Sequence, residues 1–134
     1  MDIIQLKPVT TMPKLFICLG AFNAFIAVAA GAFAAHSLKN SLSESYLAAF
    51  RTAADYQFYH ALGLIIIGLL LSSEYKQSTY VSGWIMLTGI ILFSGSLYAL
   101  ALTGTRWLGM ITPLGGICFL VAWLTIAVSY LNSK

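Results

Sequence analysis

Among the polar and ionisable side chains in or beside apolar stretches of this sequence, seven have groups that could hold a ligand. They are His36, Arg51, Asp55, Gln57, His60, Ser96 and Tyr98. Imidazole groups carry protons or bind metals, while amides, hydroxyls and charged groups can hold the polar end of a ligand. Such groups are costly at membrane depth and usually have a role where they occur there. We therefore take these seven residues as candidate ligand-binding positions.

The sequence around these residues is too apolar for a soluble domain. Of its 134 residues, 60% are hydrophobic and only 8% are charged, whereas soluble domains have about 25% charged residues. Four apolar runs approach or exceed the ~20 residues that a helix needs to cross a bilayer. They cover residues 15–35, 56–73, 80–102 and 111–131. Since the backbone must be satisfied internally in lipid and the runs do not alternate as barrel strands do, we predict an all-α membrane protein, an antiparallel four-transmembrane-helix bundle.

We predict a single transmembrane domain over residues 14–134, preceded by a flexible N-terminal extension over residues 1–13. Pro8 and Pro13 oppose helix formation before Lys14. The first apolar run is longer than the roughly 7 to 15 residues of a signal-peptide core. We therefore interpret it as a retained span.

The candidate residues gather toward one side of the predicted membrane. Successive spans run in opposite directions, so the ends of spans one and three share a face with the starts of spans two and four. His36 ends the first span, Asp55 precedes the second, Tyr98 lies late in the third and Thr112 opens the fourth. We name the side marked by these four residues the motif face. The sequence thus predicts a polar site near it.

Two short patterns indicate where helices begin. Residues 41–44 (Ser-Leu-Ser-Glu) fit a capping box, in which Ser41 accepts a hydrogen bond from a free backbone N–H and Glu44 reciprocates. Thr112-Pro113 is typical of a helix start, with Thr112 as the cap and proline in the first turn.

The segment between spans one and two has helical periodicity, and it has two interpretations. Residues 42–55 form either a separate amphipathic helix at the membrane interface or the first turns of a long second span. Arg51 and Asp55 are four residues apart, a spacing at which they can pair on one helix face.

Small residues predict close helix packing. A stripe at spacings of three and four residues runs along span one through Ala24, Ala27, Gly31 and Ala35. Such stripes let helix backbones approach each other in lipid. Gly115 and Gly116, at the start of span four, either admit a neighbouring backbone or leave a gap.

Four blocks of this sequence, in order, resemble one protein family. They are GAFAAHSLK at 31–39, TAADYQFYHAL at 52–62, LFSGSLYALALTG at 92–104 and ITPLGG at 111–116. The chain resembles the domain-of-unknown-function 423 family (DUF423, also called UPF0382), which is related to transmembrane protein 256. The resemblance implies a four-span, multi-pass protein of the bacterial plasma (inner) membrane whose biochemical function is unassigned.

We expect no bound cofactor. His36, His60 and Asp55 have the atoms of a three-ligand metal site, and the two histidines could hold a haem. Their spacing, however, matches no metal motif such as HExxH. The simpler interpretation is that each histidine forms a hydrogen bond with a backbone carbonyl or with Asp55.

Three functions remain open at this point. The first is a small membrane module that binds a lipid or quinone-like ligand through the seven candidate residues. The second is a structural or accessory subunit of a membrane complex, and the third is a transporter or channel subunit that works as a homo-oligomer. An enzyme is the least favoured class, because the sequence has no G-x-S-x-G elbow and no acidic residue in the middle of a span. Without a basic cluster, nucleic acid is not an expected partner.

Overall fold

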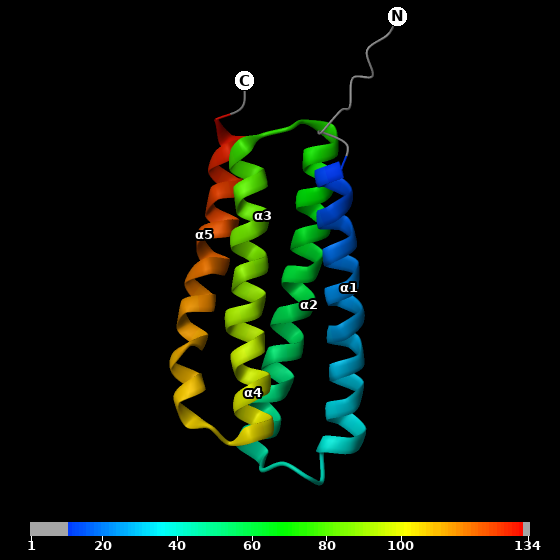
Figure 1. Ribbon diagram of the computed structural model, residues 1–134, viewed down its shortest axis with the longest axis vertical. Helices are drawn as coiled ribbons and strands as arrows, with labels where there is room; N and C mark the ends of the chain where they lie inside the picture. The colour runs from blue at the N-terminus through cyan, green and yellow to red at the C-terminus, as the bar shows by residue number, and fades with distance from the viewer. Residues whose placement is uncertain (1–10, 133–134) are drawn as a thin grey trace, which may run out of the picture.

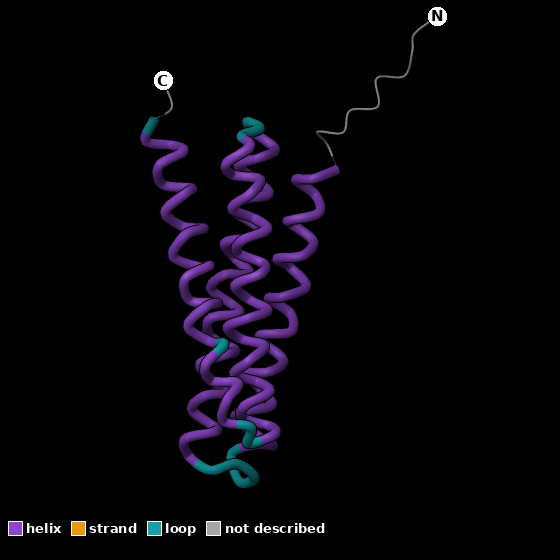
Figure 2. Tube along the Cα trace, turned by 60° about the vertical axis from the view of Figure 1, so that its left-hand side comes forward, coloured by secondary structure: helices purple, strands orange, loops and turns teal. Residues whose placement is uncertain are grey.

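The computed structural model describes residues 11–132, which form four antiparallel helical spans (Figure 1). The first is α1 (Thr11–Phe33) continued by the π-helical turn η2 (Ala34–Leu38), and the second is α2 (Glu44–Ser73). The third joins α3 (Gln77–Ile90), the π-helical turn η3 (Ile91–Gly95) and α4 (Ser96–Thr103). The fourth joins the 3-10 turn η4 (Arg106–Met110) to α5 (Thr112–Leu131). Within residues 11–132 there is no strand, so the predicted all-α bundle is confirmed (Figure 2).

The second span is one continuous helix, which decides between the two interpretations of residues 42–55. From Glu44 onward this segment forms the first turns of α2 rather than a separate interfacial helix. The prediction that Ser41 caps it was wrong, because Ser43 is the N-cap and its hydroxyl accepts a hydrogen bond from the Tyr46 N–H at 3.4 Å. Ser41 lies in the preceding turn, where its hydroxyl donates to the carbonyl of Ser37.

The first and last helices also begin differently from the prediction. Helix α1 starts at Thr11, so Pro13 lies within its first turn, where a missing N–H is tolerated. The prediction for residues 1–10 lies outside the described residues. At α5, Pro113 lies in the first turn as predicted, but Thr112 is not the cap. Its hydroxyl instead pairs with Ser96 of α4 at 2.7 Å.

Helix α2 occupies the centre of the bundle. It packs against α1, α3 and α4, while α5 packs against α3 and η3 on the far side (Figure 1). Two apolar clusters result. The larger is formed by Phe16, Leu64, Ile67, Leu71, Met86, Ile90, Phe119 and Ala122. The smaller lies near the motif face and is formed by Ala34, Leu38, Leu47, Phe50 and Ala101.

Glycine residues bring α1 and α2 into close contact. A Cβ atom at Gly20 would lie 2.6 Å from the carbonyl oxygen of Ala61, and one at Gly68 would lie 2.7 Å from that of Pro13. The predicted small-residue stripe contributes less, since Ala27 is buried but a Cβ at Gly31 would meet nothing within 4 Å. The contact between α1 and α2 at these glycines, which we call the seam, therefore depends on glycines that lie against neighbouring backbone. Backbone cannot move aside to accommodate an added methyl group as a side chain can.

The two glycines of span four behave differently from each other. A Cβ at Gly115 would collide with the backbone of Phe93, so this glycine admits η3 to α5. At Gly116 the nearest atom would be 4.0 Å away. Only Gly115 of this pair is therefore needed for close packing.

We expect Gly20→Ala to destabilise the protein by about 1–3 kcal/mol, the usual cost of overpacking, because the added methyl meets the α2 backbone. Gly31→Ala is the matched control on the same helix and should be neutral or slightly stabilising, since alanine favours helix and the site is open. Reversible unfolding in detergent micelles measures both variants. Equal stabilities for the two would contradict the importance of this seam.

Candidate functional site

A chain of side-chain hydrogen bonds links three of the helices inside the bundle. Gln57 of α2 is only 5% exposed. Its Nε2 donates to Asn23 Oδ1 of α1 at 3.0 Å, and its Oε1 accepts from the Tyr98 hydroxyl of α4 at 2.8 Å. We call Asn23, Gln57 and Tyr98 the polar relay.

The direction of each bond in the polar relay follows from its first member. Asn23 Nδ2 donates to the carbonyl of Leu19 in its own helix at 2.9 Å, so Asn23 Oδ1 is left as an acceptor. Gln57 must then present Nε2 to Asn23 and Oε1 to Tyr98, and the tyrosine hydroxyl must donate. Both ends of the Gln57 amide are thereby satisfied at a depth where water is scarce.

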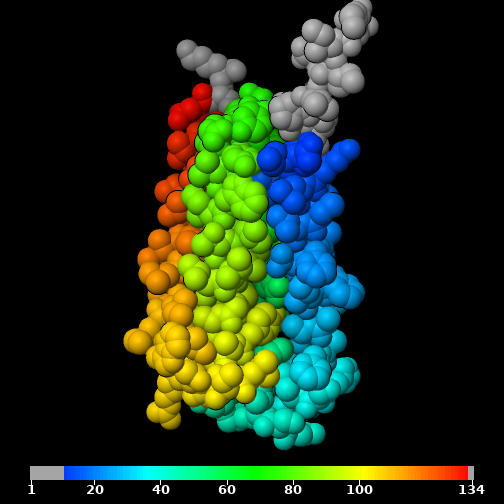
Figure 3. All heavy atoms as spheres, viewed as in Figure 1, coloured from blue at the N-terminus to red at the C-terminus, as the bar shows by residue number. Residues whose placement is uncertain are grey.

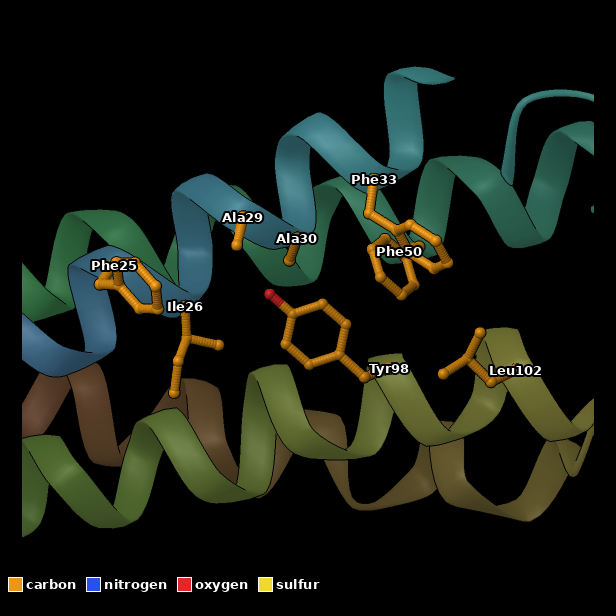
Figure 4. Close-up of a pocket in the computed structure, with 8 residues that line it drawn as sticks. All are labelled: Phe25, Ile26, Ala29, Ala30, Phe33, Phe50, Tyr98 and Leu102. Atoms are coloured by element: carbon orange, nitrogen blue, oxygen red, sulfur yellow. The ribbon is translucent and has the colours of Figure 1, made fainter. Parts of the chain in front are cut away.

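An apolar groove lies beside the polar relay, between α1 and α4. It has a volume of about 440 Å³. Its lining is formed by Phe25, Ile26, Ala29, Ala30, Phe33, Phe50, Tyr98 and Leu102. Figure 3 shows the hollow between these two helices in the motif-facing half of the molecule, and Figure 4 shows Tyr98 pointing across it toward α1. We call this the tail groove.

The aromatic ring of Tyr98 forms one wall of the tail groove. Its centroid lies 4.8 Å from that of Phe50, in an edge-on arrangement. The opposite wall, on α1, includes Ile26 and the methyl groups of Ala29 and Ala30, while Phe25 and Phe33 lie toward its two ends (Figure 4). Because these two phenylalanines are eight residues apart, the groove extends ~12 Å along α1.

Ser96 lies in a different contact from Tyr98. Its hydroxyl pairs with Thr112 Oγ1 at 2.7 Å and donates to the Phe93 carbonyl at 3.0 Å. Nearby, Ser94 is buried and donates to the carbonyl of Ala53 on α2 at 2.8 Å. These serines join helices rather than line the tail groove.

His60 faces α5 and is surrounded by aromatic rings. Its Nδ1 lies 2.7 Å from the Tyr56 carbonyl oxygen, as the simpler interpretation of the histidines predicted. Its ring stacks on Phe119 with centroids 3.4 Å apart and planes within 8° of parallel. Tyr56 and Trp123 are also close, at about 6 Å between centroids. None of these contacts involves a member of the polar relay.

The three remaining candidates are exposed. His36 lies in η2, and Arg51 and Asp55 lie on the outer surface of α2. Within residues 11–132 the structure forms an ion pair between Lys76 and Glu74 but none between Arg51 and Asp55. The four-residue spacing allowed this pairing, but the two side chains stay apart.

The seven candidates are therefore not brought together at one site. Gln57 and Tyr98 meet in the polar relay, whereas Ser96, His60 and the exposed residues lie in separate surroundings. His36, His60 and Asp55 do not form a metal-ligating group, and the described part of the chain has no cluster of three or more such side chains. Asn23, which accepts the hydrogen bond from Gln57, is not one of the seven candidates.

Sequence reasoning missed the tail groove. Its lining is apolar or small, and nothing distinguishes Phe25, Ala29 or Leu102 from other residues that face lipid. The groove arises because α1 packs along α2 and is separated from α4. The pattern of residue types along the sequence does not indicate how far apart α1 and α4 lie.

Comparison with known proteins supports the resemblance seen in the sequence. The model of the family described as "Protein of unknown function (DUF423)" matches residues 30–116. The chain belongs to this family. No solved structure matches it.

Three bacterial relatives illustrate the extent of the similarity. The chain is 48% identical over 119 residues to a UPF0382 membrane protein of Staphylococcus epidermidis, covering 89% of this chain and 97% of that protein. It is 50% identical over 115 residues to one from Staphylococcus saprophyticus (86% and 95% covered) and 46% identical over 117 residues to YwdK of Bacillus subtilis (87% and 95% covered). Together with four helices long and apolar enough to span a bilayer, this makes the DUF423 chain a multi-pass integral membrane protein of unknown function.

We expect Gln57→Leu to destabilise the protein by about 1–3 kcal/mol, because it removes two interhelical hydrogen bonds that average about 0.6 and reach about 1.7 kcal/mol each in membranes. Tyr98→Phe removes one of them and should cost less. Reversible unfolding in lipid-detergent micelles measures the difference.

Thr88→Val is the control for this experiment, since the Thr88 hydroxyl is exposed and bonds to Trp84 in its own helix. It should change stability by no more than about 0.5 kcal/mol. If Gln57→Leu cost no more than Thr88→Val, the polar relay would not be holding the helices together.

Proposed function

We propose that this protein is a small membrane module that binds a lipid or quinone-like molecule, with the hydrocarbon tail of the ligand in the tail groove. The observation that carries the proposal is the groove of about 440 Å³ between α1 and α4. This volume falls within the roughly 300–1,000 Å³ of typical ligand pockets. Its lining suits an acyl or isoprenoid chain, because the residues around it are apolar or aromatic.

The polar relay supports this proposal by holding one wall of the groove in place. The Tyr98 hydroxyl is fixed by Gln57, which is itself fixed by Asn23, so the tyrosine ring cannot swing freely into the groove. A groove with a fixed wall needs less ordering when a ligand binds, which favours affinity. In this role Gln57 and Tyr98 act together, Gln57 by positioning and Tyr98 by contact.

The polar end of the ligand would lie toward the motif face. His36 lies three residues beyond Phe33, and Arg51 adjoins Phe50, so an exposed polar side chain lies close in sequence to each of these groove residues. A long arginine side chain can extend to the headgroup region while its stem stays on apolar surface. In this proposal His60 and Ser96 hold helices together and do not contact the ligand.

We propose the bacterial plasma membrane as the location of the protein. Its relatives from Staphylococcus and Bacillus are named as membrane proteins, and its spans are α-helices of a length that crosses a bilayer.

We expect Ala29→Trp to lower the amount of lipid or quinone-like molecule that co-purifies with the protein by more than about tenfold. An indole ring in the groove would displace two or three methylenes of the ligand, at about 0.8 kcal/mol each. Native mass spectrometry of gently extracted protein measures the bound mass. Ala21→Trp is the matched control, because Ala21 is exposed on the same helix and does not line the groove.

Equal occupancy in Ala29→Trp and Ala21→Trp would contradict binding in the tail groove. If gently extracted wild-type protein carried no bound molecule, the ligand-binding function itself would be wrong. Crosslinking in native membranes would then test the accessory-subunit alternative by searching for a stoichiometric partner chain.

A further inference from the structure

A second groove lies between α1 and α2, and an acidic residue lines it. Its volume is about 220 Å³. The lining is formed by Ala27, Val28, Gly31, Ala54, Asp55, Phe58 and Tyr59. None of these residues lines the tail groove. We call this the acidic groove.

Asp55 has no counter-ion among the residues that the structure describes. Its side chain is exposed, and within residues 11–132 its carboxylate makes no ion pair or hydrogen bond with another residue. Arg51, one turn away, is not paired with it. A negative charge without a partner is expensive when it lies close to hydrocarbon, so a cation from outside the protein would be stabilised there.

The position of Asp55 along α2 places this charge near the headgroup region. The opposite end of α2 becomes polar at Ser72, and ~20 residues of helix cross the hydrocarbon layer. Counting back from Ser72 reaches Thr52. On this count Asp55 lies about one turn from the boundary, a depth that the headgroup of a bound lipid can reach.

The walls of the acidic groove suit an ammonium group. Gly31 has no side chain and its surroundings are open, which leaves room opposite α2. Tyr59 is one turn beyond Asp55 and is 56% exposed, so its side chain is accessible to a ligand. A carboxylate beside an aromatic face attracts an ammonium by charge and by cation–π interaction.

We propose that the acidic groove binds the ammonium headgroup of an aminolipid, with Asp55 as counter-ion and the Tyr59 ring packed against the cation. A volume of 220 Å³ accommodates a headgroup rather than a helix of a partner protein. The acidic groove shares no lining residue with the tail groove, so this inference does not rest on the function proposed above.

The test compares two lipids that differ at the headgroup nitrogen, where acetylation replaces the ammonium with a neutral amide. Full-length detergent-extracted protein is titrated with phosphatidylethanolamine and with its N-acetyl derivative, which keeps the phosphate and acyl chains. Wild-type protein should prefer the amine roughly threefold to tenfold, as expected for a partly exposed ion pair with a cation–π contact. Native mass spectrometry measures both occupancies.

Two substitutions locate the preference. Asp55→Asn should abolish it, whereas Glu44→Gln should keep it, because Glu44 is an exposed carboxylate on the same helix that lies outside the groove. Asp55→Glu restores the charge and should recover most of the preference, which separates lost charge from misfolding. Ala29→Trp should leave it unchanged, so a failure of the tail groove is distinguishable from a failure here.

Several results would overturn the proposal. One is equal binding of the two lipids to wild-type protein, and another is a preference that survives in Asp55→Asn. Displacement of the aminolipid by a tenfold excess of ethylammonium chloride would show that the site takes a small soluble amine. In that case the lipid headgroup would be the wrong occupant.

Discussion

Every polar group that enters the hydrocarbon layer must find its hydrogen-bond partner within the protein, and the arrangement of the bundle follows from this constraint. The helices satisfy their own backbones. Three side chains form hydrogen bonds between helices: Gln57 joins α1 to α4, Ser94 joins η3 to α2, and Ser96 joins α4 to Thr112 at the start of α5. These bonds fix which faces of the helices meet.

Close backbone contact supplies the second element of the arrangement. Gly20 and Gly68 let α1 lie directly on α2, and Gly115 lets α5 approach η3. Because α1 is held mainly by α2, its other side is left partly uncovered. The tail groove lies between α1 and α4, and the acidic groove lies between α1 and α2, so α1 contributes to both concave surfaces.

Residues at the start of the second span show why the seven candidate residues do not form a single site. An α-helix turns by about 100° per residue, so Asp55 and Gln57 point to nearly opposite sides of α2. Gln57 is therefore buried between α1 and α4, Asp55 is exposed in the acidic groove, and His60 stacks on Phe119 of α5. These residues lie within two turns of one another on α2, but their side chains face different neighbours.

The sequence by itself determined the number and type of the spans, because the length of an apolar run is set by bilayer thickness and lipid allows few backbone conformations. It also determined family membership, the place of Pro113 in a first turn and the placement of Gln57 among the polar residues near the motif face. Helix starts were predicted less well: Ser43 rather than Ser41 caps α2, since several serines there offer nearly equal caps. Only the tertiary structure decided that Gln57 bonds to Tyr98, that Arg51 leaves Asp55 unpaired, and that the space between α1 and α4 stays open. Those outcomes depend on the rotation and separation of whole helices, which are set by glycine contacts between distant segments and leave no periodic pattern along the chain.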